Sequence, residues 1–291
     1  MELHLASMEN VTCWAFRKLC PGITDSYTGI FSMNYLVNRH KAWKEVDTFP
    51  IMGQKQWIQV ATSKESECKE FVGVMNKELN DDPEKDSAYG VQLNLSCPSP
   101  MIIKLGQGPA LIKRSLKVTS LLKELLKQDR LKVSLKTRLG LNYRDVENEK
   151  IIKLFSELEK INDPNFTQVV VHFKHASEPS FTRYDYSFLP RLTEFNIPIV
   201  INGGIKNYND FLNITKNLHQ RHKKNIVGFM IGREALKNPD CFIESSKILN
   251  KREFNPRTKE EIKAEFQKNC LVHEPKEIYS KKIQEICEWA K

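Results

Sequence analysis

Short apolar runs rich in β-branched residues recur at intervals along the chain. Within each run the apolar character is nearly continuous and does not alternate with polar positions. Such runs are typical of strands that are covered on both faces in a parallel sheet. We therefore predict eight strands, over residues 3–7, 27–33, 57–61, 90–95, 132–137, 168–173, 197–202 and 226–232.

Helical periodicity fills several of the intervals between these strands. The clearest case is residues 109–128, where leucines and isoleucines fall mainly on one side of a helix and Pro109 suits its first turn. Shorter patterns of this kind cover residues 147–161, 208–222 and 238–249. Strand followed by helix, repeated about eight times, predicts a (β/α)8 TIM barrel, with a doubly wound open sheet as the alternative.

The strand signals stop near residue 245, and the chain changes character there. Residues 259–270 and 275–291 have the pattern of basic, amphipathic helices. We therefore expect a barrel domain over residues 1–244 and a small helical C-terminal segment over residues 245–291. The sequence leaves open whether these last helices bind a partner or only pack on the barrel.

The overall charge adds an expectation about partners. The chain has 291 residues and carries 45 lysines and arginines against 36 aspartates and glutamates, so its net charge is +9. This excess favours a polyanionic partner, because basic residues gather in residues 219–225, 250–263 and 281–284. An ordinary lysine-rich surface is the alternative.

Cysteine spacing, apolar runs and the start of the chain bear on where the protein is found in the cell. Seven cysteines are scattered without a C-x-x-C pair, which favours a reducing cytoplasm. No run approaches the roughly 18 apolar residues of a membrane span, and the start of the chain has no signal-peptide pattern. The sequence also has no H-E-x-x-H zinc helix. We expect a cytoplasmic monomer that binds neither metal nor membrane.

The carboxyl ends of the predicted strands carry the candidate chemistry, because barrels of this kind build their sites there. These ends offer Met8, Gln59, Asn94 with Cys97, Lys136 with Arg138, His172, Asn202 with Gly203 and Gly204, and Gly232 with Arg233.

Two glycine-bearing turns, at residues 201–207 and 230–236, follow the last two predicted strands. Glycine lets backbone N–H groups approach a phosphate, and Arg233 can add a charge-assisted contact. Phosphate sites of barrels commonly lie at these two loops. The sequence therefore predicts a phosphate site here.

Lys136 and His172 raise a question about burial, since both end strands that should be covered on both faces. An unpaired buried lysine is costly, so Lys136 needs an anionic or electron-rich partner. Together with a phosphate site, the two residues suit the pyrimidine edge of a flavin, and Gln59 can reach the flavin's amide edge. Taken alone, a histidine at a strand end is more often a structural residue, and Cys97 also fits the role of a small hydrophobic residue at a strand end.

Several segments, in order along the chain, resemble the successive motifs of the tRNA-dihydrouridine synthases. The resemblance runs from about residue 3 to 242, and residues 227–239 are its most specific part. It also departs from the family pattern, notably in the first motif, where Ser7, Glu9, Asn10 and Cys13 replace expected residues. The segments are "LASMENVTCWAFRKLC", "NLSCPSP" with "GQGPALI", "VSLKTRLG", "VVVHFKHASEPSF", "IPIVINGGI" and "VGFMIGREALKNPDCF".

This resemblance implies an FMN barrel followed by a helical segment that binds tRNA, here residues 245–291. It implies that NADPH reduces FMN, that the flavin passes a hydride to C6 of a uracil, and that Cys97 protonates C5. Asn94 and Arg138 are then the substrate-binding residues, and Met8, Gln59, Lys136 and His172 hold FMN with the two glycine turns. A stacked uracil is out of reach, so the base must be extruded from the folded tRNA.

Two other functions stay open. The segment "NLSCPSP" also resembles that of dihydroorotate dehydrogenases, another class of FMN barrel, although the basic C-terminal segment argues against it. A non-catalytic RNA-binding barrel would account for the altered first motif. Retention of Cys97, Lys136, His172 and Arg233 argues against a barrel that has lost its chemistry.

Overall fold

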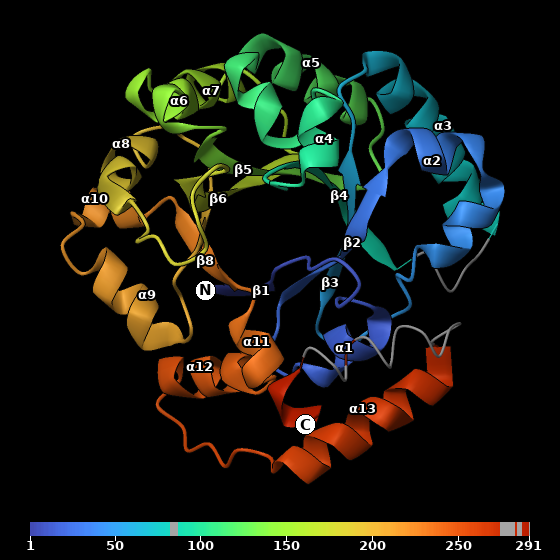
Figure 1. Ribbon diagram of the computed structural model, residues 1–291, viewed down its shortest axis with the longest axis vertical. Helices are drawn as coiled ribbons and strands as arrows, with labels where there is room; N and C mark the ends of the chain where they lie inside the picture. The colour runs from blue at the N-terminus through green and yellow to red at the C-terminus, as the bar shows by residue number, and fades with distance from the viewer. Residues whose placement is uncertain (82–86, 274–282, 284–286, 291) are drawn as a thin grey trace.

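Eight parallel strands form one closed barrel in chain order, and β8 pairs back to β1 (Figure 1). The computed structural model describes residues 1–81, 87–273, 283 and 287–290. All eight predicted strands are confirmed, and closure excludes the open sheet. The strands are β1 (Glu2–Leu5), β2 (Asp25–Ser32), β3 (Lys55–Ala61), β4 (Ala88–Leu95), β5 (Lys132–Gly140), β6 (Phe166–His175), β7 (Ile199–Asn202) and β8 (Ile226–Ile231).

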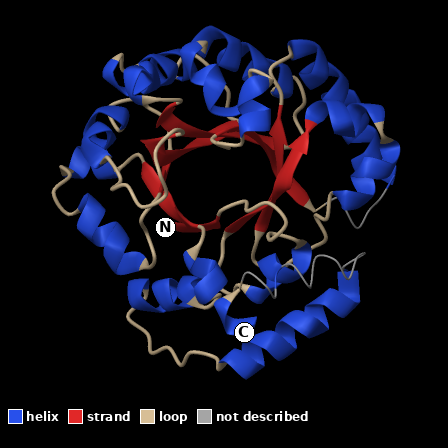
Figure 2. Cartoon of the chain, in the orientation of Figure 1, coloured by secondary structure: helices blue, strands red, loops and turns tan. Residues whose placement is uncertain are grey.

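The helices form a ring outside the barrel (Figure 2). No helix among the described residues has the length and apolar character needed to cross a membrane. The helices are α1 (Trp14–Leu19), α2 (Met33–Asn38), η1 (His40–Glu45), α3 (Glu65–Asp81), α4 (Pro100–Lys104), η2 (Gly108–Lys113), α5 (Ser115–Leu125), α6 (Tyr143–Glu147), α7 (Lys150–Leu158), η3 (Tyr186–Phe188), α8 (Leu189–Leu192), α9 (Tyr208–Thr215), α10 (Gln220–Lys223), α11 (Glu234–Lys237), α12 (Cys241–Leu249), α13 (Lys259–His273) and η4 (Glu288–Ala290).

The continuous apolar character of the strands follows from burial on both of their faces. In β6, Val169 and Val171 join the large cluster between the strands and the helices. Val170 belongs instead to a small cluster inside the barrel, with Trp57 and Val200. Successive side chains point to opposite faces of a strand, so both faces of β6 need apolar residues.

The amino-terminal end of the barrel is filled by a polar network. The Tyr27 hydroxyl lies 2.9 Å from His4 Nδ1, and Trp57 Nε1 donates to Asp25 Oδ1 at 2.8 Å. His4 Nε2 also lies 3.3 Å from a Glu2 carboxylate oxygen. Because these buried groups satisfy one another, this end is closed, and the large cavity of the molecule opens at the other end.

Residues 109–128 form two helices, η2 and α5, where the periodicity predicts one. Arg114 separates them with a non-helical backbone, at φ −125° and ψ 59°. Leu121 and Leu122 are buried as expected, but Leu116 is 70% exposed. The prediction of a single helix was wrong because periodicity records the buried face of a helix and not a break within it.

The described part of the C-terminal segment packs against the barrel's outer ring. Helix α13 lies along α1 (Figure 1), where Asn269 Nδ2 donates to the Ala15 carbonyl oxygen at 3.4 Å and Phe266 is fully buried. The division at residue 244 stays a prediction, since α12 runs across it. Most of the predicted helix at 275–291 lies outside the described residues.

Candidate active site

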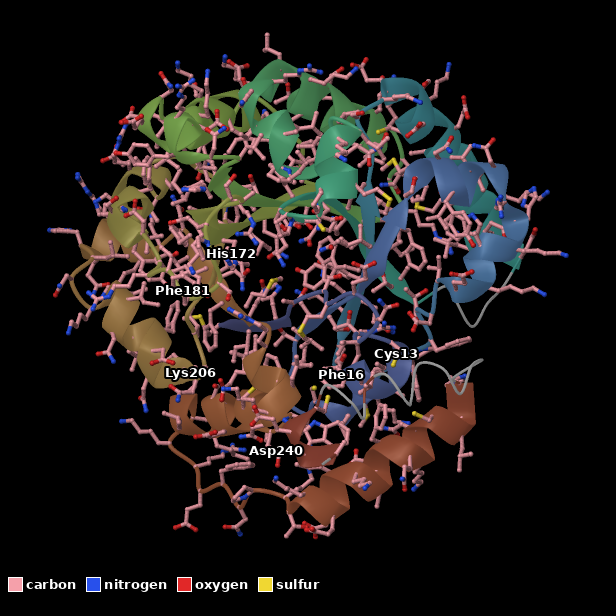
Figure 3. All side chains as sticks on the ribbon, viewed as in Figure 1. Cys13, Phe16, His172, Phe181, Lys206 and Asp240 are labelled. Carbon is pink, nitrogen blue, oxygen red and sulfur yellow. The ribbon has the colours of Figure 1, made fainter. Side chains whose placement is uncertain are left out.

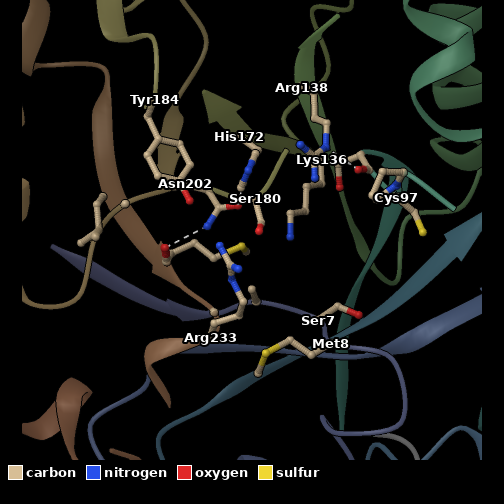
Figure 4. Close-up of a pocket in the computed structure, with 18 of the residues that line it drawn as sticks. Ser7, Met8, Cys97, Lys136, Arg138, His172, Ser180, Tyr184, Asn202 and Arg233 are labelled. Carbon is tan, nitrogen blue, oxygen red and sulfur yellow. Dashed lines mark hydrogen bonds between the residues drawn. The ribbon is translucent and has the colours of Figure 1, made fainter. Parts of the chain in front are cut away.

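A cavity of about 940 Å³ opens at the carboxyl ends of the strands (Figure 4). Figure 3 shows His172 near the barrel opening, with Phe181 and Lys206 nearby at its edge. All of the residues predicted from the strand ends line this one cavity. They are Met8, Gln59, Asn94, Cys97, Lys136, Arg138, His172, Asn202, Gly203, Gly204, Gly232 and Arg233.

A chain of buried amides runs across β3, β4 and β5 beneath the cavity. Asn94 Nδ2 donates to Gln59 Oε1 at 2.7 Å, and Gln59 Nε2 donates to Gln92 Oε1 at 2.6 Å. Gln92 Nε2 then donates to Ser134 Oγ at 3.1 Å. Because each amide satisfies the next, the orientation of Gln59 and Asn94 at the cavity floor is fixed.

The loop that carries Cys97 is held by the two residues that the sequence assigned to substrate. Asn94 Oδ1 accepts from the backbone N–H groups of Ser96 and Cys97, both at 2.9 Å. Arg138 Nε donates to the Ser96 carbonyl oxygen at 2.7 Å, and a second Arg138 nitrogen lies 3.4 Å from the His175 carbonyl oxygen. These contacts fix the thiol-bearing loop, while the substrate-binding roles of Asn94 and Arg138 stay predictions.

Lys136 extends into the cavity from β5 (Figure 4) and is only 7% exposed. Burial, followed by repulsion from the Arg138 guanidinium, lowers the pKa of Lys136 to about 8. Among the described residues, no acceptor lies within hydrogen-bonding distance of its Nζ atom. A buried amine that lacks an acceptor is stabilised when an anionic or electron-rich ligand binds to it.

His172 is neutral and held in one orientation. Its Nδ1 atom lies 2.8 Å from Asn202 Oδ1, and Asn202 Nδ2 donates to the Met230 carbonyl oxygen at 3.0 Å. That network assigns the proton to Nδ1 and leaves a lone pair on Nε2. Burial, followed by the Arg138 charge, lowers the pKa of His172 to about 3.

The first glycine turn is shaped by backbone conformation and by a tyrosine. Gly203 and Gly204 have φ values of 113° and 64°, which side chains rarely allow. A Cβ atom at these positions would lie 2.5 Å and 2.8 Å from the Tyr184 ring. The same ring packs edge-on against His172, with 5.6 Å between ring centroids, and lies under the Lys174 ammonium at 4.4 Å. Only glycine fits this turn.

The second glycine turn is open. A Cβ atom on Gly232 would meet only Ala6, at an ordinary 3.5 Å, so neither packing nor a positive φ requires glycine there. Arg233 follows and reaches into the cavity (Figure 4). The structure therefore places a cation and an uncrowded backbone beside the first glycine turn.

Sequence reasoning missed a second set of cavity residues. The loop after β6 contributes Arg183 and Tyr184, and Lys206 and Lys237 lie at the rim. Ser7 also lines the cavity, and its buried Oγ atom has no hydrogen-bond partner among the described residues. Apart from Lys237, which ends α11, these residues lie on loops without periodicity, although the mix of aromatic and basic residues at 181–186 was a usable signal.

Together these features define a (β/α)8 barrel whose ligand cavity lies where barrel enzymes carry their active sites. It holds a thiol, a buried amine, a neutral histidine and two glycine turns. Residues 4–288 match the dihydrouridine synthase family, and the chain belongs to this family.

Curated relatives and solved structures agree with this assignment. The chain is 27% identical over 161 residues to the tRNA-dihydrouridine(20) synthase (NAD(P)+) of Schizosaccharomyces pombe. The aligned region covers 53% of this chain and 31% of that protein. It is 29% identical over 190 residues to a probable tRNA-dihydrouridine synthase of Helicobacter pylori, covering 63% and 51%. The chain thus spans between about a third and a half of the length of these relatives.

Solved structures support the fold. A variant of NCR from Zymomonas mobilis superposes with a TM-score of 0.53 at 10% identity, covering 94% of both chains. Morphinone reductase superposes with a TM-score of 0.52 at 8% identity, covering 91% of this chain and 88% of that one. At such low identity these similarities concern the barrel alone.

Proposed function

We propose that this protein is a tRNA-dihydrouridine synthase, which reduces the C5–C6 double bond of a uridine in tRNA with FMN and NADPH. Family membership supports the reaction class. The observation that carries the proposal is the thiol of Cys97, on a loop held by Asn94 and Arg138, at the wall of a cavity that also presents Lys136.

The cavity residues fit a flavin mononucleotide. Among the described residues, Lys136 offers a buried amine without a hydrogen-bond acceptor, and Ser7 offers a hydroxyl without a partner. Gly204, the open turn at Gly232 and Arg233 suit the phosphate, because an accessible backbone and a guanidinium both bind phosphate oxygens. We therefore assign the isoalloxazine edge to Lys136 and Gln59, and the phosphate to the two glycine turns with His172 nearby.

Bound FMN, reduced by NADPH, would supply a hydride to C6 of the uracil ring. Cys97 donates its S–H proton to C5, so that hydride and proton together saturate the C5–C6 bond. The resulting thiolate regains a proton from solvent. Asn94 and Arg138 keep the loop in place during this transfer, because three of their hydrogen bonds end on its backbone.

The tRNA is the polyanionic partner in this proposal. The uridine has to leave the stacked RNA to reach the cavity floor, as base-modifying enzymes generally require. Arg183, Lys206 and Lys237 at the cavity rim can contact the phosphates that flank it. Residues 245–291 are proposed to extend this contact surface.

A single-turnover experiment with Cys97→Ala tests the proposal. Rapid mixing of pre-reduced enzyme with unmodified tRNA follows flavin reoxidation directly. We expect this step to slow by about 10²- to 10⁴-fold, the usual effect of losing a general acid, with FMN content and NADPH oxidation preserved. Cys68→Ala on α3, which lies outside the cavity, is the control, and we expect it to react at the wild-type rate.

Three results would contradict the proposal. Reoxidation of Cys97→Ala by tRNA at the wild-type rate would remove the thiol from the mechanism. Reoxidation of the wild-type enzyme by free uracil or orotate, but by no tRNA, would favour the dihydroorotate dehydrogenase class. A folded protein that purifies without flavin and binds none would favour the non-catalytic alternative.

A further inference from the structure

A second cavity, of about 400 Å³, lies beside the first. The two share Met8, Glu9 and Ile30 in their walls, so they adjoin across the loop after β1 and the middle of β2. The volume is near the lower end of the roughly 300–1,000 Å³ of typical ligand pockets. In Figure 3 its wall residue Cys13 appears between the barrel opening and α13.

The walls of the second cavity are rich in flat rings. Phe31, Tyr35, Phe49 and His273 line it, and His273 comes from the end of α13. The rings of Phe49 and His273 are stacked, with centroids 4.2 Å apart and planes inclined by 11°. Trp14 packs edge-on against His273 at 4.5 Å. His273 is therefore held as a rigid part of an aromatic wall.

The polar groups of the second cavity differ in sign from those of the first. Its described wall residues present the carboxylates of Glu9, Glu45 and Asp47 and the ammonium of Lys44. Asp47 is engaged by the Trp14 backbone N–H at 2.7 Å and by Arg17.

The other two carboxylates keep acceptor capacity. Glu45 Oε1 accepts from the Tyr35 hydroxyl at 3.0 Å, which leaves its second oxygen available. Glu9 has no hydrogen-bond or ion-pair partner among the described residues. Such groups repel phosphate and accept hydrogen bonds from N–H donors.

We propose that the second cavity binds the nucleobase next to the extruded uridine, and that it selects a base with an exocyclic amino group. The inference rests on the proposed function. Aromatic rings stack on the faces of bases, and carboxylates accept from the amino groups of adenine, guanine and cytosine, which uracil lacks. Because the two cavities adjoin, consecutive nucleotides can occupy them. His273 then gives the C-terminal segment a direct part in reading the substrate.

The nicotinamide of the reductant is a poorer occupant. Its diphosphate would have to lie close to three carboxylates, one of which, Glu9, also lines the first cavity. That charge repulsion favours an uncharged base over a dinucleotide.

The test uses tRNA transcripts in which the base on either side of the mapped target uridine is removed. Pre-reduced wild-type enzyme is mixed with each transcript, and flavin reoxidation is followed. Loss of the base on one side should lower the second-order rate by about 5- to 150-fold, the range of a lost base stack. A uracil in place of the natural base on that side should lower the second-order rate by an intermediate factor.

Two Tyr35 variants locate the effect. Tyr35→Ala removes a stacking surface, so it should lower the rate with intact tRNA by about the same factor as loss of the base does. With the abasic transcript, the substitution should lower the rate little further. Tyr35→Phe keeps the ring and should stay within a few-fold of wild type. Glu9→Gln should reduce the discrimination against uracil, and it serves if Tyr35→Ala folds poorly, since Glu9 is exposed.

Three outcomes would overturn the inference. The wild-type enzyme could react as fast with every abasic transcript as with intact tRNA. The effects of Tyr35→Ala and of the abasic site on the activation free energy could also add, which would mean that they are independent. Alternatively, Tyr35→Ala could slow NADPH oxidation and leave the tRNA step unchanged, which would assign the cavity to the reductant. A wild-type enzyme that no tRNA reoxidises would refute the proposed function itself, and this is a separate result.

Discussion

Replacing Lys136 with methionine should stabilise the flavin-free protein. Lys136 is 7% exposed, and its pKa falls from 10.5 to about 8 chiefly because burial penalises the charged form. At about 1.4 kcal/mol per pKa unit, the ammonium costs the folded state about 3 kcal/mol at pH 7. Methionine has a similar shape and no charge, so the variant should gain up to about this amount.

The pH dependence provides a sharper form of this prediction. The folded pKa of Lys136 lies below the unfolded value, so the unfolded chain holds more protons between pH 8 and 10.5. The free energy of unfolding of the wild type should therefore rise with pH across this window. Below pH 8 the penalty for burying the Lys136 ammonium is fully present. The gain in the free energy of unfolding from Lys136→Met, relative to the wild type, should be largest at pH 7 and should vanish near pH 10.5.

Urea denaturation of flavin-free protein at pH 7 and at pH 10 measures the effect. The matched control is Lys132→Met on the same strand, where the amine donates to Asn165 Oδ1 at 2.7 Å. That variant should lose about 1 kcal/mol, the usual value of one hydrogen bond. A Lys136→Met protein that is less stable than wild type at pH 7, or whose gain does not change with pH, would refute the reasoning.

Three further predictions concern the same cavity and its partner. Since the pKa of His172 is about 3, its NMR signals should show a neutral ring from pH 8 down to about pH 4, and a midpoint near 6.5 would contradict the burial argument. Gly203→Ala should cost about 1–3 kcal/mol in urea denaturation and weaken FMN binding, whereas Gly73→Ala in α3, with open space around it, should gain about 0.5–1 kcal/mol. The affinity for tRNA, measured by filter binding, should fall with salt with a log–log slope of about −0.7 to −0.9 per phosphate contacted, and a flat dependence would exclude a phosphate-binding rim.

The sequence by itself determined the barrel and the strand-end residues of its main cavity. Burial on both faces leaves a local record in each strand, as in the three valines of β6. Once the strands are parallel and closed, their carboxyl ends meet at one opening, so Lys136, His172 and Arg233 share a cavity although they are far apart in the chain.

Only the tertiary structure decided the contacts that loops make with one another and with the ends of helices. Tyr184 packs on Gly203, and His273 completes a wall with Phe49, yet no periodicity marks any of these positions. Loop side chains are placed by long-range packing, which depends on where the neighbouring elements lie. The two glycine turns were therefore visible in the sequence, whereas the second cavity depends on the packing of α13 against the start of the chain, more than 220 residues away.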